Sequence, residues 1–223
     1  MATEASKTKS FWGPKILTLL EGSGIDIGCG PDPILPGVRR FDQEHGDANR
    51  VSAYVNEKFD FVFSSHCLEH MKDPVLSLAD WWSLVKPGGH LIILVPDEDL
   101  YEQGTFPSIF NSDHKNTFTI SKAKSWSARS HNVFDLAKNL RGEIISLELQ
   151  DFGYDRSLMR SNPTRLSRKL GRYFRRIAKS TSNTAFRVKL AKIFYRLGAT
   201  VDQTDLGDVR LAQIQLILRK PLS

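Results

Sequence analysis

The fold is decided at Gly24-Ile25-Asp26-Ile27-Gly28-Cys29-Gly30-Pro31-Asp32-Pro33, where a short β-branched run ends in two closely spaced glycines. Glycine adopts backbone angles that other residues disfavour, and it has no Cβ to keep a ligand at a distance. The stretch therefore predicts a strand that leads directly into a tight turn beside a bound small molecule. The same turn also occurs in doubly wound sheets without a ligand, so the motif alone leaves both interpretations open.

An acidic residue farther along the chain supports the ligand-binding interpretation. Asp42 directly follows Val38-Arg39-Arg40-Phe41, which we interpret as a second strand. An acidic side chain at the end of that strand is where α/β folds bind the ribose hydroxyls of a nucleoside. The other interpretation is that Asp42 is a solvated residue at a strand end.

Three more sequence blocks follow. Phe59-Asp60-Phe61-Val62-Phe63-Ser64-Ser65 is a further predicted strand, Leu68-Glu69-His70 comes next, and Val85-Lys86-Pro87-Gly88-Gly89 precedes the apolar run Leu91–Val95. Together with the glycine turn, these blocks make the stretch from Gly24 to about Pro96 resemble the class I S-adenosylmethionine-dependent methyltransferases, in their small-molecule, type 11-like branch. The order and spacing of the blocks are much more specific than any one of them.

The pattern as a whole predicts one α/β domain, residues 1–223, with the class I methyltransferase fold. Asp73 and Pro74 begin a predicted helix, because aspartate is a favoured N-cap and proline suits the first helical turn. Strands alternate with helices, which predicts a doubly wound, Rossmann-like and mostly parallel sheet. The stretches 143–149 and 211–218 alternate apolar and polar residues, and in the resembled family the last two strands are adjacent and antiparallel. Residues 1–10 are polar, and we expect them to be flexible.

Two departures from the family pattern concern the cofactor turn. Pro31, Pro33 and Pro36 exclude a helix interior between Gly30 and Asp42, because proline lacks the amide hydrogen and clashes with the preceding turn. The first crossover helix is therefore expected to be absent or reduced to a turn, and the third glycine of a dinucleotide site is missing. These features argue against NAD, whose pyrophosphate needs a helix N-terminus, whereas S-adenosylmethionine has no phosphate. They also leave open a non-catalytic binding protein on a decayed methyltransferase fold.

Positive charge is concentrated in one segment. The net charge is +6, yet residues 156–200 hold thirteen Lys and Arg with no Asp or Glu, against eighteen basic and twenty-five acidic residues elsewhere. Apolar residues recur there at helical spacing, which predicts two basic amphipathic helices within an insertion at about residues 152–205, before the last strand. Such a segment suits an anionic membrane surface or an acidic protein partner. The other interpretation is that the apolar stripes pack on the domain and only the charges face water.

Composition and targeting signals favour a cytoplasmic protein, either free or peripheral at the inner face of a membrane. The longest apolar run, Leu91–Val95, is far shorter than a bilayer span, and no cleavage site follows the N-terminal lysines. Cys29 and Cys67 have no C-x-x-C spacing, which argues against a structural zinc site or a disulfide framework. We expect both to be ordinary packed thiols.

The resemblance assigns roles to named residues. The cofactor-binding residues that it implies are Asp26, Gly28, Cys29, Gly30, Asp42, Asp47, Ala48 and Ser65. Within this set, the glycine turn holds the amino-acid end of S-adenosylmethionine, Asp42 holds the ribose, and Asp47-Ala48 lie near the adenine. Ser65 and His66, just past a strand, face the methyl group and the acceptor. Because methyl transfer from a sulfonium depends mainly on positioning, such a site needs few reactive side chains.

Two histidine patterns add hypotheses about catalysis. Asp113-His114-Lys115 lies in the segment Asp97–Thr119, a candidate lid, where a carboxylate beside His114 could tune a general base for a hydroxyl acceptor; a merely exposed loop histidine is the other interpretation. His66-Cys67-Leu68-Glu69-His70 spells H-x-x-E-H, the inverted zinc-peptidase motif. That motif belongs on a helix, whereas here it begins at a strand end and no third ligand is marked. We therefore expect no metal site, with His66 and His114 as the catalytic candidates.

These observations predict an S-adenosylmethionine-dependent methyltransferase with a small-molecule or saccharide-type acceptor. The acceptor class rests on the divergent lid, which resembles bacterial methyltransferases associated with surface-saccharide assembly. A nucleic-acid methyltransferase is one alternative, because a basic face could bind phosphates. Against it, no N-P-P-Y or D-P-P-Y motif follows the strand at 59–65. A zinc hydrolase is a weaker alternative.

Overall fold

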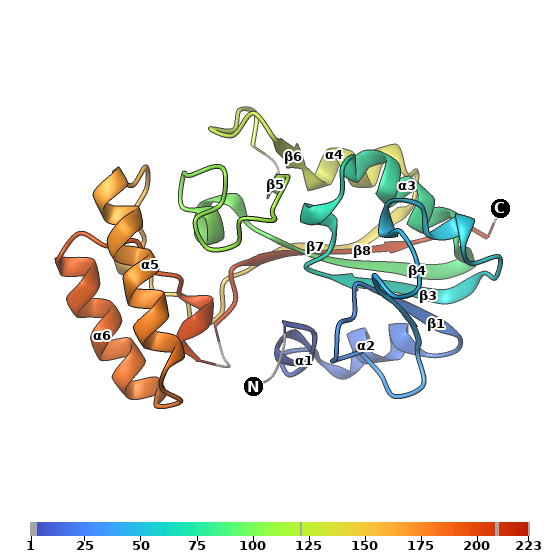
Figure 1. Cartoon of the computed structure of the whole chain (residues 1–223). Helices are drawn as coiled ribbons and strands as arrows, with labels where there is room; N and C mark the ends of the chain where they lie inside the picture. The colour runs from blue at the N-terminus through green and yellow to red at the C-terminus, as the bar shows by residue number, and fades with distance from the viewer. Residues whose placement is uncertain (1–3, 121, 208–209, 223) are drawn as a thin grey trace.

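A six-stranded sheet forms the centre of the protein (Figure 1). The computed structural model describes residues 4–120, 122–207 and 210–222. The strands, in the order β2-β1-β3-β4-β8-β7, are β1 Gly24–Ile27, β2 Arg39–Phe41, β3 Phe59–Ser65, β4 Val85–Pro96, β7 Glu143–Gln150 and β8 Gln213–Arg219. β1, β2, β3 and β4 are parallel to one another, and β8 is antiparallel to both of its neighbours. The predicted α/β fold with a mostly parallel sheet is confirmed.

Helices cover both faces of the sheet (Figure 1). One face carries α3 (Pro74–Ser83) and α4 (Val133–Asn139), and the other carries α1 (Glu4–Lys9) and α2 (Pro14–Leu17). The larger apolar core lies under α3 and α4 and contains the fully buried Trp81. α3 begins where the sequence predicts, because the Asp73 carboxylate accepts hydrogen bonds from the backbone N–H groups of Val75 and Leu76.

The N-terminal segment corrects the expectation of a flexible polar tail. Residues 1–3 lie outside the described part of the chain, but Glu4–Lys9 forms α1, in which Ala5 and Thr8 are buried. Ser6 donates hydrogen bonds from its backbone N–H and its hydroxyl to the Asp32 carboxylate. Residues 30–38 contain no helix, as the prolines predict, and of them Ile34 is buried in the same apolar cluster as Ala5. α1 therefore has an apolar surface to cover, and it packs there.

The segment after β4 is more ordered than an irregular lid. A π-helix at Glu98–Glu102 and strand β5 (Thr117–Thr119) lie within it, and β5 pairs in parallel with β6 (Ser130–Asn132) as a small second sheet. The backbone N–H groups of Lys115 and Asn116 donate to the Glu69 carbonyl oxygen at 2.9 and 3.1 Å. The remaining short 3₁₀ helices are Thr18–Leu20, Ala48–Ala53, Leu68–His70, Arg156–Leu158 and Thr204–Leu206.

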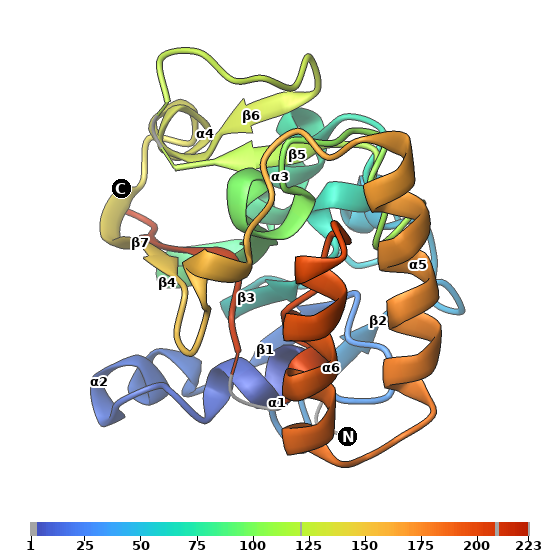
Figure 2. The ribbon, with the colours of Figure 1, turned by 90° about the vertical axis from the view of Figure 1, so that its left-hand side faces the viewer.

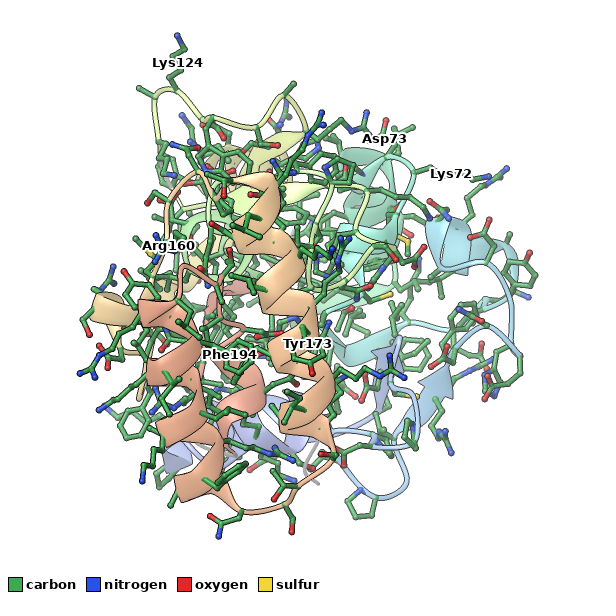
Figure 3. All side chains as sticks on the ribbon, turned by 60° about the vertical axis from the view of Figure 1, so that its left-hand side comes forward. Lys72, Asp73, Lys124, Arg160, Tyr173 and Phe194 are labelled. Atoms are coloured by element: carbon green, nitrogen blue, oxygen red, sulfur yellow. The ribbon has the colours of Figure 1, made fainter. Side chains whose placement is uncertain are left out.

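Two helices lie beyond the carboxyl ends of the parallel strands, between β7 and β8 in the chain (Figures 1 and 2). They are α5 (Arg165–Lys179) and α6 (Thr184–Arg196), as the basic amphipathic pattern predicts. The hairpin has a core of its own, made of Phe174, Ala178, Ala191, Val201 and Leu206. Phe194 lies between the two helices, with its ring centroid 5.5 Å from that of Phe174 and 6.2 Å from that of Tyr173 (Figure 3).

Only part of the predicted apolar stripes packs inward. The exposed apolar side chains of the hairpin are Leu166, Tyr173, Phe186, Ile193 and Leu197. One set of side chains therefore builds the hairpin core and another faces solvent, and binding of the exposed set to a membrane or partner stays a prediction. Within the described parts of the chain, no helix has the length and apolar character needed to cross a membrane.

Candidate active site

Two cavities meet at the carboxyl edge of the sheet. The larger, of about 450 Å³, lies beyond β1 and β2 and is lined by Asp42 among others. The smaller, of about 160 Å³, lies toward the helical hairpin and is lined by Arg175 of α5. Three residues, His66, His70 and Asn111, line both cavities. Molecules bound in the two cavities would therefore touch the same side chains.

Four of the eight residues assigned to the cofactor line the larger cavity, namely Gly28, Asp42, Asp47 and Ala48. Gly28 has a φ of +77°, and a Cβ added there would lie 2.6 Å from the Cβ of Cys67. The turn after β1 therefore requires glycine both for its backbone angle and for its contact. Asp47 is an N-cap, and hydrogen bonds from the Asn49 side chain and backbone lower the pKa of its carboxyl.

Asp42 links the ends of two strands. It directly follows β2, and its Oδ2 accepts a hydrogen bond from the N–H of Gly30, at 2.6 Å, in the turn after β1. Its Oδ1 accepts from the N–H of Gln43 at 2.7 Å. The backbone thus fixes the carboxylate at the wall of the larger cavity.

The other four assigned residues lie around the larger cavity rather than on its lining. Asp26 is buried in β1, where its Oδ2 accepts the N–H of Ile34 at 2.7 Å and burial raises its carboxyl pKa to about 7. Cys29 is buried, and this burial raises the pKa of its thiol. Gly30 has a φ of +52° and open space where a Cβ would stand. The Ser65 hydroxyl is buried at the end of β3 and has no hydrogen-bond partner among the described residues.

His66 stands between the two cavities. It follows β3 directly and has a φ of +53°, a left-handed conformation that turns the chain toward the site. Its Nε2 lies 2.9 Å from Oε1 of Gln213 on β8, and its Nδ1 lies 3.4 Å from Oε1 of Glu69. Its imidazole is thereby held on both sides while it remains part of both cavity walls.

His114 has a different carboxylate partner from the one that its sequence neighbour suggests. Its Nδ1 lies 2.6 Å from Oε1 of Glu102, and both side chains are buried. Asp113 instead pairs with His70, with 2.9 Å between Oδ2 and Nδ1. The His114 ring also stacks on Tyr101 at 5.3 Å between centroids. His114 is therefore a buried, oriented imidazole in the smaller cavity and not an exposed loop residue.

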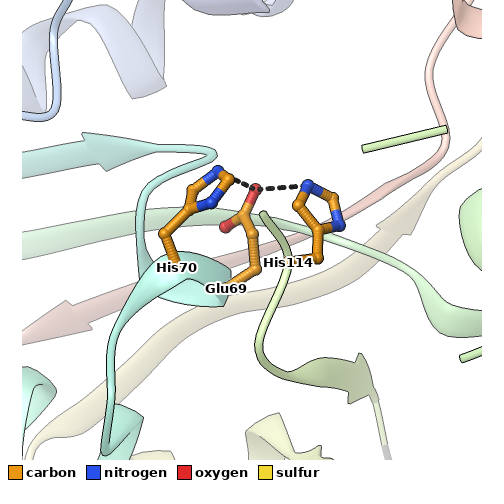
Figure 4. Close-up of side chains that lie close together, drawn as sticks. All are labelled: Glu69, His70 and His114. Atoms are coloured by element: carbon orange, nitrogen blue, oxygen red, sulfur yellow. Dashed lines mark ion pairs between the residues drawn. The ribbon is translucent and has the colours of Figure 1, made fainter. Parts of the chain in front are cut away.

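Glu69 lies between His70 and His114 (Figure 4). Its Oε1 is 3.8 Å from Nε2 of His114 and 4.0 Å from Nε2 of His70. Burial opposes the ionisation of Glu69, but the surrounding imidazoles, with His66 foremost, hold its carboxyl pKa below the usual value. The site therefore holds an ionised carboxylate inside a ring of imidazoles.

The zinc-peptidase interpretation of H-x-x-E-H does not fit the local geometry. His66 precedes the short 3₁₀ helix Leu68–His70 and has a left-handed backbone. The two histidines are therefore not one turn apart on an α-helix, as that motif requires.

A third cavity, of about 600 Å³, lies between α5 and residues 107–112. Arg165, Arg168 and Arg172 line it together with Phe110 and Ser112. Asn111, between those two residues in the chain, lines the other two cavities. Guanidinium groups are well suited to bind phosphate and carboxylate groups, so this cavity suits an anion close to the active site.

Comparison with known proteins identifies the family. A family model described as a methyltransferase domain matches residues 4–155, which is more than half of the chain. The chain belongs to this methyltransferase family. The predicted enzyme class, an S-adenosylmethionine-dependent methyltransferase, and the predicted cofactor are thereby confirmed.

Solved structures agree with the fold of this methyltransferase. A protein of Bacillus halodurans C-125, assigned as a methyltransferase, is 14% identical, with a TM-score of 0.51 over 94% of this chain and 100% of that chain. A protein of Galdieria sulphuraria, assigned as a sarcosine dimethylglycine methyltransferase, is 12% identical, with a TM-score of 0.51 over 97% of this chain and 85% of that chain. At such identities the likeness concerns the fold alone. No curated protein matches the chain.

The residues around the larger cavity fit S-adenosylmethionine. Its volume lies in the usual range of ligand sites, roughly 300 to 1,000 Å³. Gly28 offers close backbone approach, and Asp42 offers carboxylate oxygens where the family places ribose hydroxyls. Residues 30–38 provide no helix N-terminus, which a cofactor without phosphate does not need. The roles of the single residues stay predictions.

Several residues of the methyltransferase site were not found from the sequence. Asn49, Asn111 and Lys115 line the larger cavity, and Tyr101, Arg175 and Thr204 line the smaller one. Asn111 lies in the predicted lid and Arg175 in the predicted basic helix, so the segments were identified without the positions. Nothing in the local pattern distinguishes Arg175 from the other arginines of α5.

Proposed function

We propose that this methyltransferase methylates a hydroxyl group of a small, saccharide-type acceptor bound in the smaller cavity. The observation that carries the proposal is the shared wall of the two cavities, formed by His66, His70 and Asn111. S-adenosylmethionine, bound in the larger cavity, supplies an electrophilic methyl group. An acceptor oxygen beside the shared wall would then lie next to that group, and such positioning supplies much of the rate enhancement.

His66 is the better placed of the two predicted catalytic histidines. It lines both cavities, whereas His114 lines only the smaller one. Gln213 Oε1 can only accept, so Nε2 of His66 carries a proton and the unprotonated Nδ1 takes the hydroxyl proton as the acceptor oxygen gains its methyl group. The Glu69 carboxylate, 3.4 Å from Nδ1, favours the resulting imidazolium. Gln213 fixes the ring in place. His114 then orients groups in the acceptor cavity.

The arginine-lined cavity favours an acceptor that carries an anionic group. Arg165, Arg168 and Arg172 lie beside the loop whose Asn111 reaches the active site. A phosphorylated saccharide could place its hydroxyl in the smaller cavity and its phosphate among these guanidinium groups. We therefore expect phosphate-bearing sugars to be better acceptors than neutral ones.

The test uses tritium-labelled S-adenosylmethionine and a panel of free sugars, sugar phosphates and nucleotide-linked sugars, with RNA and DNA offered in parallel. Label transferred to a saccharide, with a preference for the phosphorylated members, supports the proposal. The double substitution Arg168→Gln and Arg172→Gln should raise the KM for a phosphorylated acceptor by about tenfold or more, because charged hydrogen bonds contribute about 1.5 to 3 kcal/mol each. Label found in RNA or DNA instead, or in none of the panel, would contradict it.

A membrane location of the acceptor is favoured by a separate observation. Leu166, Tyr173 and Leu197 on the hairpin are 60 to 65% exposed. The segment around them, residues 156–200, contains Lys and Arg but no Asp or Glu. An exposed apolar set framed by Lys and Arg is typical of helices that lie on anionic bilayers. We propose that the hairpin brings the methyltransferase to such a surface.

Flotation with vesicles tests the membrane proposal. The protein should float with vesicles that contain anionic lipid, less so at high salt, and not with neutral vesicles. The pair Leu166→Asn and Leu197→Asn should reduce flotation, while Leu76→Asn, at a similarly exposed position on α3, should not. Indifference to both vesicle types would contradict the proposal, and capture by an acidic protein or by nucleic acid instead would replace it.

A further inference from the structure

Glu69, His70 and His114 form a compact cluster at the wall of the smaller cavity (Figure 4). One ligand atom from each lies within 4.8 Å of the others. Glu69 and His114 are buried, and His70 is half-buried. The cluster brings together residues of the 3₁₀ helix Leu68–His70, which follows β3, and of the segment after β4.

The Glu69 carboxylate has imidazoles around it at ion-pair distance, but none of them in hydrogen-bond geometry. It is 1% exposed, and within the described parts of the chain neither of its oxygens has a hydrogen-bond partner. A buried carboxylate without hydrogen bonds is costly, so such groups are normally paired or coordinate a metal. The nearest positive groups are the imidazoles, whose nitrogens stay 3.4 to 4.0 Å from Oε1.

Both histidines of the cluster are oriented as metal ligands usually are. His70 Nδ1 is engaged by Asp113, at 2.9 Å from Oδ2, and His114 Nδ1 is engaged by Glu102, at 2.6 Å from Oε1. With Nδ1 engaged in this way, Nε2 of each ring faces Glu69. A carboxylate on the outer nitrogen that fixes the ring and its tautomer is the usual support of a metal-binding histidine.

We propose that Glu69, His70 and His114 bind a divalent transition-metal ion. Metal bonds of about 2.1 Å in tetrahedral directions require donor atoms about 3.4 Å apart. The Glu69 oxygen lies 3.8 and 4.0 Å from the two Nε2 atoms, and all three ligand atoms lie within 4.8 Å of one another, so the side chains must move together, by up to about an ångström or more in the widest pair, to complete the set. Two imidazoles and one carboxylate suit Zn²⁺, Mn²⁺, Fe²⁺ or Co²⁺ better than Mg²⁺ or Ca²⁺, which prefer oxygen ligands.

The location gives the ion a role. The cluster lines the cavity to which we assign the acceptor, so three protein ligands leave a position for an acceptor oxygen. A bound metal would orient the hydroxyl and lower its pKa, which eases the proton transfer to His66. This role rests on the proposed function, whereas the binding of the ion does not.

The experiment uses full-length protein purified without a histidine tag, stripped with EDTA and dialysed. Titration with Zn²⁺, Mn²⁺ and Co²⁺ should reveal saturable binding of one ion per chain by calorimetry and elemental analysis. With Co²⁺, absorption bands of a nitrogen- and oxygen-ligated ion should appear and should shift when a hydroxyl acceptor is added.

Variants decide whether the ion binds at this cluster. Glu69→Gln and His70→Ala should each weaken binding by at least about tenfold, and Glu102→Gln, which touches no metal, by about 10- to 100-fold. His90→Ala, a half-buried histidine on β4 away from both cavities, is the control and should bind normally. A substitution of His114 is left out of the test, because this side chain is buried and its loss would disturb the packing around it.

Two outcomes overturn the proposal. One is the absence of stoichiometric binding of any of the three ions to folded native protein. The other is binding that Glu69→Gln and His70→Ala leave unchanged. Binding of S-adenosylmethionine and labelled methyl transfer, measured on the same samples, report on the proposed function separately, since a metal-free protein that still methylates saccharides contradicts only the role of the ion in catalysis and not its binding.

Discussion

The sheet and the cap over its carboxyl edge are built on different principles. The sheet side holds most of the apolar core, with β1 and β3 paired in an unbroken register. The cap, made of residues 97–119 and 152–206, has a small apolar core in the hairpin and is also held by polar contacts between distant positions. Examples are Gln103 Nε2 to the Val201 carbonyl at 2.8 Å and Arg175 to Asp205 at 2.7 Å. The comparison teaches that the cofactor side is specified by local pattern, and the acceptor side by long-range polar pairs.

The polar cap also explains where the chemistry lies. Glu102 and His114 come from the cap, and Glu69 and His66 come from the residues that follow β3. Buried polar networks of this kind fix side-chain geometry when all members have partners, and a member without a hydrogen bond needs an explanation, of which a bound ion is one. Glu69 is such a member.

The largest expected effect is the loss of turnover on substitution of His66, which lies where the sheet side meets the cap. In His66→Asn, turnover should fall by about 10²- to 10⁴-fold, because the proton acceptor is lost. Asparagine tolerates the left-handed backbone at this position, so the fold should persist. The measurement is release of S-adenosylhomocysteine with a saccharide acceptor, together with calorimetric cofactor affinity, which should change by no more than a few-fold.

His90→Asn, on β4, serves as the matched control and should keep full turnover. If His66→Asn lowers turnover less than tenfold and leaves the pH profile unchanged, His66 only positions the acceptor.

The same division between sheet and cap separates what can be predicted from the sequence from what cannot. β3 spans the predicted residues, and α3 starts at the predicted proline, because each depends on a local pattern. His114 was found as a candidate, but its carboxylate is Glu102, twelve positions away, and not its neighbour Asp113. Sequence adjacency carries no information about which side chains face each other in an irregular segment. The same limit hid Arg175 and the cluster around Glu69.

A second prediction concerns the one buried carboxyl group within β1. Burial raises the pKa of Asp26 from 3.8 to about 7, so the folded state keeps this proton over a range where the unfolded state has lost it. Its contribution to stability is fully present below pH 3.8 and is lost as the pH rises toward 7. Asp26→Asn keeps an oxygen for the Ile34 N–H and never ionises. The variant should therefore be more stable than the native protein at pH 8, by roughly 2 to 4 kcal/mol.

Urea unfolding between pH 4 and 8, followed by tryptophan fluorescence, measures this difference. The gap between variant and native protein should widen up to about pH 7 and stay constant above it. A gap that is the same at pH 4 and pH 8 would mean that Asp26 ionises normally and that the sheet side tolerates a buried charge.

A third prediction breaks the cap while sparing the sheet. A Cβ at Gly171 would lie 2.3 Å from the Thr200 carbonyl oxygen, a backbone atom that cannot move alone. Gly171→Ala should destabilise the hairpin by about 1 to 3 kcal/mol, as overpacked substitutions do. Hydrogen exchange should rise in α5 and α6 but not in β1, β3 or β4. Gly13→Ala, which meets open space, is the control. Loss of protection throughout the sheet would show that cap and sheet unfold as one unit.

The smallest expected effect concerns the cofactor side, and it separates a ligand contact from a structural one. Asp42 already accepts the Gly30 N–H at 2.6 Å, so Asp42→Ala removes a support of the turn as well as the assigned ribose acceptor. Affinity for S-adenosylmethionine should fall by more than about tenfold, because a charged hydrogen bond contributes roughly 1.5 to 3 kcal/mol.

Asp42→Asn retains an oxygen for Gly30 but loses the charge, and calorimetry should place its affinity between those of the native protein and Asp42→Ala. If Asp42→Asn binds as weakly as Asp42→Ala, the charge on the ribose side is what matters; if it binds like the native protein, the backbone link to Gly30 carries the effect. Native affinity in a folded Asp42→Ala protein would remove Asp42 from the cofactor site altogether.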